Sequence, residues 1–111
     1  MTGNEYQSLA MRTRNTDLSE LDSLINGVMG LCGESGECAD MVKKMLFQGA
    51  ELDLEHFVKE LGDVLWYIAL CCETLDQSLD DVMQRNIDKL KARYPEGFDP
   101  QRSQHREAED V

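Results

Sequence analysis

The sequence has little proline and no pattern typical of β-strands. Only 2 of its 111 residues are proline, and both of them, Pro95 and Pro100, lie near the end of the chain. Residues 1–94 therefore contain no residue that would break a helix by removing a backbone donor. Strict alternation of apolar and polar residues is also absent. These absences predict an all-α protein.

The cysteines and histidines lack the spacing of a metal or redox motif. None of the four cysteines forms a C-x-x-C pair, and they are Cys32, Cys38, Cys71 and Cys72. The two histidines, His56 and His105, are not placed to complete a zinc site. There is no secretory signal and no apolar run of about 18 residues. We therefore expect a cytoplasmic protein with reduced, mostly buried thiols.

Basic residues are also scarce. The chain has 11 lysines and arginines against 22 aspartates and glutamates, which gives a net charge of −11. Nucleic-acid binding needs a basic surface, so we expect no nucleic-acid partner, and we expect no membrane partner either. A phosphate ligand is compatible with this charge only if a divalent cation converts a carboxylate cluster into its binding site.

What the sequence does contain is a series of helix-start signals. They lie at Thr2, Asp17, Asp53 and Ser78. The first helix is short and ends near Arg14, the second is long and ends at Gly49, and Pro95 closes the fourth. The prediction is a four-helix antiparallel bundle with short loops, in which the two long helices follow a short N-terminal one and precede one C-terminal helix.

The third predicted helix is apolar all round. It carries no charge from Val64 to Cys72, and Trp66 and Leu70 lie opposite its main apolar stripe. A helix of this kind is covered on every side, and so small a chain cannot cover it alone. We therefore expect a second subunit over this helix, in a dimer or a dimer of dimers.

Glycine recurs every three residues in the second predicted helix, at Gly27, Gly30, Gly33 and Gly36. Glycine in a helix interior costs up to about 1 kcal/mol relative to alanine. Close helix packing is the favoured explanation, because no Gly-Lys-Ser or Gly-Lys-Thr follows to form a phosphate-binding loop.

Two pairs of acids are the strongest candidates for chemistry. Glu34 and Glu37 are three residues apart on the second helix, and Glu60 and Asp63 are three apart on the third. One such pair is very often a solvated face, but antiparallel packing would bring these two pairs together. Four unpaired acids in a partly buried place are costly, and a hard cation with oxygen ligands removes that cost. The candidate ligands predict a Mg²⁺ site, in which Mn²⁺ can substitute.

Candidate phosphate-binding residues follow on the fourth helix. Asn86, Lys89 and Arg93 lie beside its apolar stripe, where the two cations could hold phosphate oxygens. An exposed polar face with ordinary ion pairs explains the same pattern. Lys44 could reach the acidic pairs, and Tyr67 could contact the substrate or pack at an interface.

Three runs of the sequence resemble the MazG-like nucleoside triphosphate pyrophosphohydrolases. These runs span residues 30–37, 60–63 and 86–98, and the last is Asn-Ile-Asp-Lys-Leu-Lys-Ala-Arg-Tyr-Pro-Glu-Gly-Phe. The resemblance covers the chain up to Phe98. We therefore expect a MazG-like domain over residues 1–98 and a polar, flexible tail over residues 99–111.

The resemblance implies Mg²⁺-dependent hydrolysis of a nucleoside or deoxynucleoside triphosphate to a monophosphate and pyrophosphate. It also implies an all-α dimer, or a dimer of dimers, with the site near the subunit interface. The base and the sugar stay open. Two alternatives also stay open: a metal-dependent nucleotide phosphatase that releases orthophosphate, and a non-catalytic helical regulatory or interaction module with the same fold.

Overall fold

The computed structural model describes residues 1–108 and 110–111, and these residues form helices and no strands. The prediction of an all-α protein is therefore confirmed. The five helices are α1 (Gly3–Met11), α2 (Glu20–Gln48), α3 (Leu54–Thr74), α4 (Leu79–Arg93) and α5 (Pro100–Gln104).

The helices begin where short polar side chains satisfy free backbone donors. Thr2 and Glu5 form a complete capping box at α1, while Asp53 and Ser78 cap α3 and α4 as predicted. The predicted cap of α2 is wrong by two residues. Ser19, rather than Asp17, is the residue whose side chain accepts the hydrogen bond that starts the helix.

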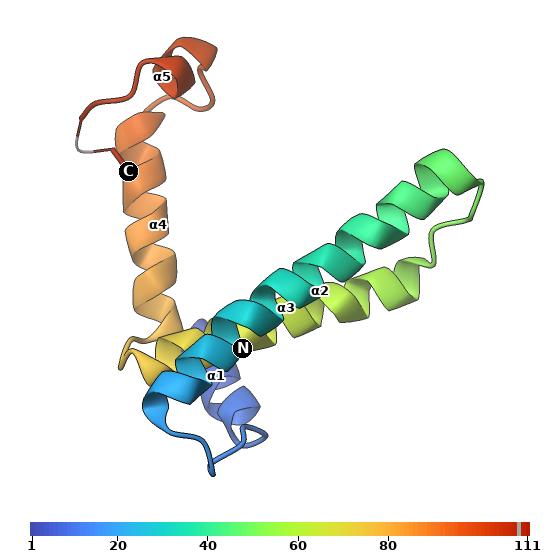
Figure 1. The fold of residues 1–111 in the computed structure, drawn as a ribbon. Coiled ribbons are helices and arrows are strands. Elements are labelled where there is room, and N and C mark those ends of the chain that lie inside the picture. The colour runs from blue at the N-terminus through green and yellow to red at the C-terminus, as the bar shows by residue number, and fades with distance from the viewer. Residues whose placement is uncertain (109) are drawn as a thin grey trace.

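Helices α2 and α3 form a long hairpin, and α1 packs against α3 at the open end of this hairpin, its base, opposite the loop that joins the two helices (Figure 1). Helix α4 contacts α1 at this base and then points away from the hairpin. The predicted compact bundle of four helices is therefore not what a single chain forms. The first turn of α4 contacts α1 both through polar groups and through the buried side chain of Leu79.

Gln7 of α1 makes the central contacts of this junction. The buried Gln7 amide donates to Glu73 Oε2 at 2.8 Å and to the Gln77 carbonyl at 3.1 Å, and it accepts from the Leu79 backbone N–H at 2.7 Å. This one side chain thereby joins the end of α3, the connecting turn and the start of α4. A buried amide with these partners is strongly directional, so it fixes the angle at which α4 leaves.

The core of the single chain is small. Its buried apolar residues are Met11, Ala69, Leu70, Cys72 and Leu79. Trp66 packs against this core and donates through Nε1 to Thr13 Oγ1 at 2.9 Å. Leu70 is 2% exposed within the single chain, so the expectation that a second subunit covers it is wrong, whereas Trp66 is only partly buried and its cover by a second subunit stays a prediction.

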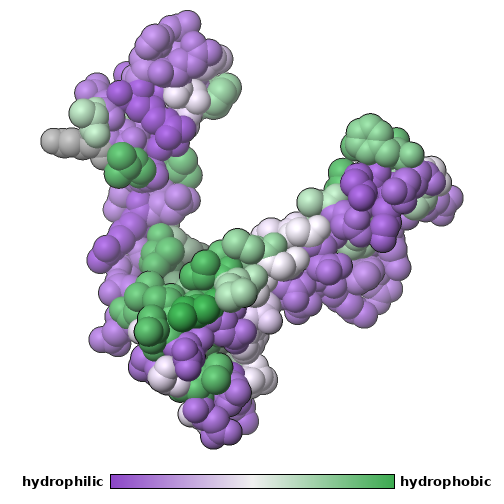
Figure 2. Space-filling view, in the orientation of Figure 1, coloured by the Kyte–Doolittle hydropathy of each residue, from purple (hydrophilic) through white to green (hydrophobic). Residues whose placement is uncertain are grey.

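Other apolar residues of the helices are left exposed. On α2 they are Leu21, Ile25, Val28 and Met29; on α3 they are Leu54, Val58, Leu61 and Leu65; on α4 they are Val82, Met83, Ile87 and Leu90. Figure 2 shows apolar side chains gathered in the angle between α4 and the hairpin. So much exposed apolar surface marks a place for protein association.

Two of the four helical glycines serve close packing, as predicted. A Cβ at Gly27 would lie 2.8 Å from Cys71 Sγ, and a Cβ at Gly30 would overlap the ring of Tyr67. The other two, Gly33 and Gly36, have no such neighbour. Close packing therefore explains the first half of the glycine series only.

The tail contains structure that the sequence pattern does not predict. Asp99 caps α5 through its side chain, and Pro100 occupies the first turn of that helix. Whether the tail is flexible stays a prediction. Across the described part of the chain, the helices are too short or too polar to cross a membrane.

Candidate metal centre

The α2–α3 hairpin brings three of the four predicted acids together. Carboxylate oxygens of Glu34, Glu60 and Asp63 all lie within 4.8 Å of one another. The packing of Tyr67 onto Gly30, one turn from these acids, holds the two helices close at this point. Helix pairing therefore places a group of oxygen ligands on one side of the hairpin.

Glu34 and Glu60 interact directly. A hydrogen bond between the two carboxyl groups, together with burial and the charges of neighbouring acids, raises the pKa of Glu34 to about 7. The same hydrogen bond and a contact with His56 lower the pKa of Glu60. In the absence of a cation, the two side chains share one proton.

One oxygen of this pair has no partner. Glu60 Oε1 lies 3.1 Å from His56 Nε2, whereas Glu60 Oε2 is buried without a hydrogen-bond partner. The Glu60 side chain as a whole is only 15% exposed. An unpaired carboxylate oxygen beside two other acids is unfavourable. A Mg²⁺ or Mn²⁺ ion fits this donor set, because both prefer oxygen ligands.

Glu37 lies outside this close group. Its side chain is exposed, and its charge still contributes to the raised pKa of Glu34. The prediction that Glu37 is a metal ligand is therefore the weakest of the four.

The predicted phosphate-binding residues are not beside the acids of the same chain. Asn86, Lys89 and Arg93 lie on α4, which points away from the hairpin (Figure 1). Arg93 instead pairs with Asp110 of the tail. A site that unites these residues with the acidic cluster requires α4 from another copy.

The two remaining candidates have partners within the chain. Lys44 Nζ pairs with Asp40 at 2.8 Å, and this contact raises the pKa of Lys44. The Tyr67 ring packs on Gly30 and meets Trp66 edge to face, with 5.0 Å between the ring centroids. Packing within the chain thus accounts for Tyr67, and its contact with a substrate stays a prediction.

Sequence reasoning missed two residues near the cluster. His56 lies four residues before Glu60 on α3, and this helical spacing was the signal that could have revealed it. Tyr6 of α1 lies near Asp63; burial and then the charge of Asp63 raise its pKa. No local signal identifies Tyr6, because its proximity depends on how α1 packs.

Comparisons with known proteins find sequence similarity over most of the chain. Residues 23–98 match the family model of the MazG nucleotide pyrophosphohydrolase domain, a range that contains all four predicted acids. The chain is also 39% identical over 85 residues to the Gene 37 protein of Mycobacterium phage L5, across 73% of this chain and 75% of that protein. No solved structure matches the chain significantly. This chain belongs to the MazG nucleotide pyrophosphohydrolase domain family.

Proposed function

We propose that the protein hydrolyses nucleoside or deoxynucleoside triphosphates to a monophosphate and pyrophosphate with the help of Mg²⁺. The observation that carries the proposal is the cluster of Glu34, Glu60 and Asp63, with its buried, unpartnered Glu60 oxygen. The cluster lies inside the range that matches the MazG family, whose name already describes nucleotide pyrophosphohydrolysis.

The three clustered acids would hold the cation, and His56 would orient Glu60 through its contact with Oε1. When bound, Mg²⁺ neutralises triphosphate charge and lowers the pKa of a bound water. Glu37 is exposed and lies outside the close group of ligand atoms, so its carboxylate is free to take the proton of the attacking water.

The substrate phosphates would be held by Lys89 and Arg93, with Asn86 as a hydrogen-bonding partner. Because α4 points away from its own acidic cluster, these residues would serve the cluster of a second copy. Lys44 and Tyr67 would lie at the margin of such a site. A homodimer or homotetramer therefore completes the proposed site.

Two observations support a second copy of this chain as the partner. The single chain buries few apolar residues, and it leaves apolar stripes exposed on α2, α3 and α4. Apolar burial contributes roughly 25 cal/mol per Å², so covering these stripes supplies stability that the small core lacks.

The experiment is a panel of the common nucleoside and deoxynucleoside triphosphates incubated with Mg²⁺, with products resolved by ion-exchange chromatography. Pyrophosphate and a monophosphate should appear in equal amounts, and EDTA should stop the reaction. Orthophosphate with a diphosphate would identify a phosphatase instead. Absence of turnover across the panel would favour a non-catalytic module.

A pair of variants sharpens this test. Glu60→Gln removes charge but keeps shape, and we expect at least about a hundredfold lower turnover because a ligand of the cation is lost. Glu55→Gln makes the same change on the same helix at a side chain that is 85% exposed, and it should retain wild-type turnover. Circular dichroism checks that both variants stay helical. Wild-type turnover in Glu60→Gln would remove the acidic cluster from the mechanism.

A further inference from the structure

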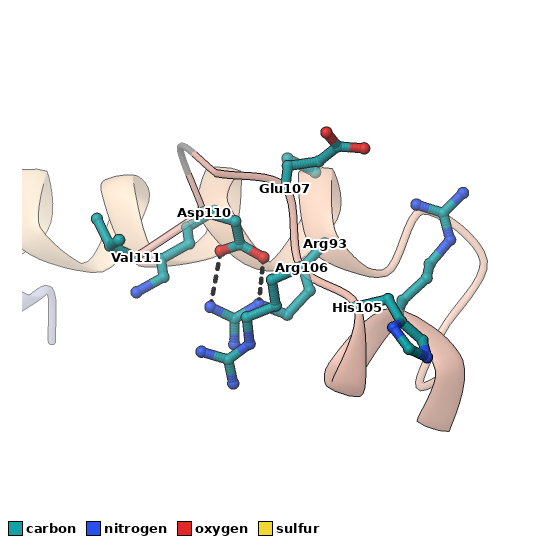
Figure 3. Close-up of a pocket in the computed structure, with 9 residues that line it drawn as sticks. Arg93, His105, Arg106, Glu107, Asp110 and Val111 are labelled. Carbon is teal, nitrogen blue, oxygen red and sulfur yellow. Dashed lines mark hydrogen bonds and ion pairs between the residues drawn. The ribbon is translucent and has the colours of Figure 1, made fainter.

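The tail folds back onto the C-terminal end of α4. There the Arg93 guanidinium donates two parallel hydrogen bonds to the Asp110 carboxylate, from Nε at 2.6 Å and from Nη2 at 2.7 Å (Figure 3). Both side chains are largely buried, at 10% and 12% exposure. This contact links two residues that are 17 positions apart, and it closes one side of a cavity of about 480 Å³.

Positive charge gathers around this cavity. Four of the chain's 11 basic residues line it, together with one histidine: Lys89, Arg93, Arg102, Arg106 and His105. Glu107 and Asp110 line the same cavity, so two carboxylates of the tail offset part of this positive charge, and release of Asp110 would leave more of it for another anion. The hydrogen bonds from Arg93, and then the positive charges of Arg93, Arg106 and Lys89, lower the pKa of Asp110, so this carboxylate is ionised at neutral pH.

The two donor groups of Arg93, Nε and Nη2, are called the Arg93 fork below. The carboxylate that occupies this fork is Asp110 of the same chain. A guanidinium binds carboxylate and phosphate oxygens with the same bidentate geometry. Asp110 therefore takes the two donors that a phosphate group would need.

Few contacts other than the ion pair with Arg93 hold Asp110 in place. Helix α5 has five residues and buries none of them, and the tail lies beyond the residues that match the family model. Releasing Asp110 would therefore expose little apolar surface, and water would solvate its carboxylate. The ion pair is formed, but few other contacts hold the tail in place.

We propose that Asp110 is an intramolecular competitor for phosphate, which occupies the Arg93 fork and must be displaced before a phosphate group binds there. The regulatory consequence rests on the proposed function, in which Arg93 holds substrate phosphates. In that case the tail raises the KM for the nucleotide and leaves kcat unchanged.

The direct test measures binding of inorganic pyrophosphate by isothermal titration calorimetry in EDTA. Removing the competing charge with Asp110→Asn should tighten binding about three- to tenfold, because the variant loses the charge-assisted hydrogen bonds that hold the Arg93 guanidinium. A chain that ends at Arg106 should show the same gain, and this second variant keeps the test valid if the substitution disturbs the tail. Unfolding midpoints confirm that both variants fold.

Glu107→Gln is the matched control. It removes the same charge from the same tail, but the Glu107 carboxylate points away from Arg93 (Figure 3). Its affinity for pyrophosphate should stay within about twofold of wild type, because Asp110 still occupies the Arg93 guanidinium and the charge removed from the cavity wall is screened. Equal tightening by both variants would show that general repulsion, rather than occupation of the fork, opposes phosphate.

Steady-state kinetics supply the second readout. Asp110→Asn should lower KM for the triphosphate by the same factor and leave kcat unchanged, since it alters binding alone. Unchanged or weaker pyrophosphate binding in Asp110→Asn, or absence of binding to any variant, would contradict the proposal that Asp110 competes with phosphate for Arg93. If pyrophosphate binding tightens but no triphosphate is hydrolysed, competition by Asp110 is supported and the proposed hydrolytic function is contradicted.

Discussion

The proton shared by Glu34 and Glu60 links the acidic cluster to the stability of the chain. The pKa of Glu34 rises from 4.5 to about 7 on folding, so between these two pH values the Glu34 carboxyl group holds its proton more often in the folded chain than in the unfolded one. The contribution of Glu34 to the free energy of unfolding is therefore fully present below about pH 4.5 and is lost as pH rises toward 7. A bound cation reverses this trend, because it favours the ionised carboxylates.

We predict that Mg²⁺ stabilises the protein more at pH 8 than at pH 5. Thermal unfolding midpoints followed by circular dichroism, in EDTA and in excess Mg²⁺, measure the effect. Glu34→Gln is the reference: in EDTA, the stability of wild type relative to this variant should fall from pH 5 to pH 8. A rise over that range would contradict the assignment of the shared proton.

At the residue scale, the sequence was enough to predict which acids lie together, but not which side chains surround them. Helical spacing and the antiparallel hairpin are enough to bring Glu34, Glu60 and Asp63 together. The unpartnered oxygen of Glu60 and the proximity of Tyr6 depend on side-chain packing, which periodicity does not describe.

Secondary-structure elements were predicted well because their signals are local. The caps at Thr2, Asp53 and Ser78 each use a side chain and a backbone donor within three residues. The start of α2 was harder, since the segment offers both Asp17 and Ser19 as capping residues. The glycine series was half explained, because residues three apart do not complete a turn of 3.6 residues, so successive glycines move to different sides of α2.

The α2 glycines give a prediction for single helices. Gly30→Ala should lower the unfolding midpoint, because its Cβ would overlap the Tyr67 ring. Gly36→Ala, on the same helix, meets nothing within 4 Å, so it should stabilise the chain by up to about 1 kcal/mol through helix propensity. Thermal unfolding of the two variants at one protein concentration makes the comparison. Equal effects of the two substitutions would contradict the close contact between α2 and α3.

The arrangement of the whole molecule could not be predicted from the sequence. An apolar stripe has the same periodicity whether its cover comes from its own chain or from another. The sequence therefore predicted apolar faces on α2, α3 and α4 but assigned them to a bundle within one chain. It also chose Leu70 as an interface residue, although this side chain is buried within its own chain.

We predict that Ile87→Glu lowers the oligomeric mass and the activity together. Ile87 is 45% exposed on the apolar side of α4, and a charge placed there would be buried without a partner by a second copy. Sedimentation velocity at micromolar concentration measures the mass. Arg85→Glu puts the same acid on the opposite side of α4, at a side chain that is 73% exposed, and should change neither. A fully active monomer of wild type would contradict the shared site.

The Gln7 contacts hold only one end of α4, at the turn before Leu79, so a small rotation at this turn displaces the whole helix. A helix of 15 residues is about 22 Å long, so a 10° change at this turn moves its far end by roughly 4 Å. Arg93 lies at that far end. A substitution at Gln7, which contacts neither the clustered acids nor Arg93, would thus change the direction of α4 and the position of Arg93.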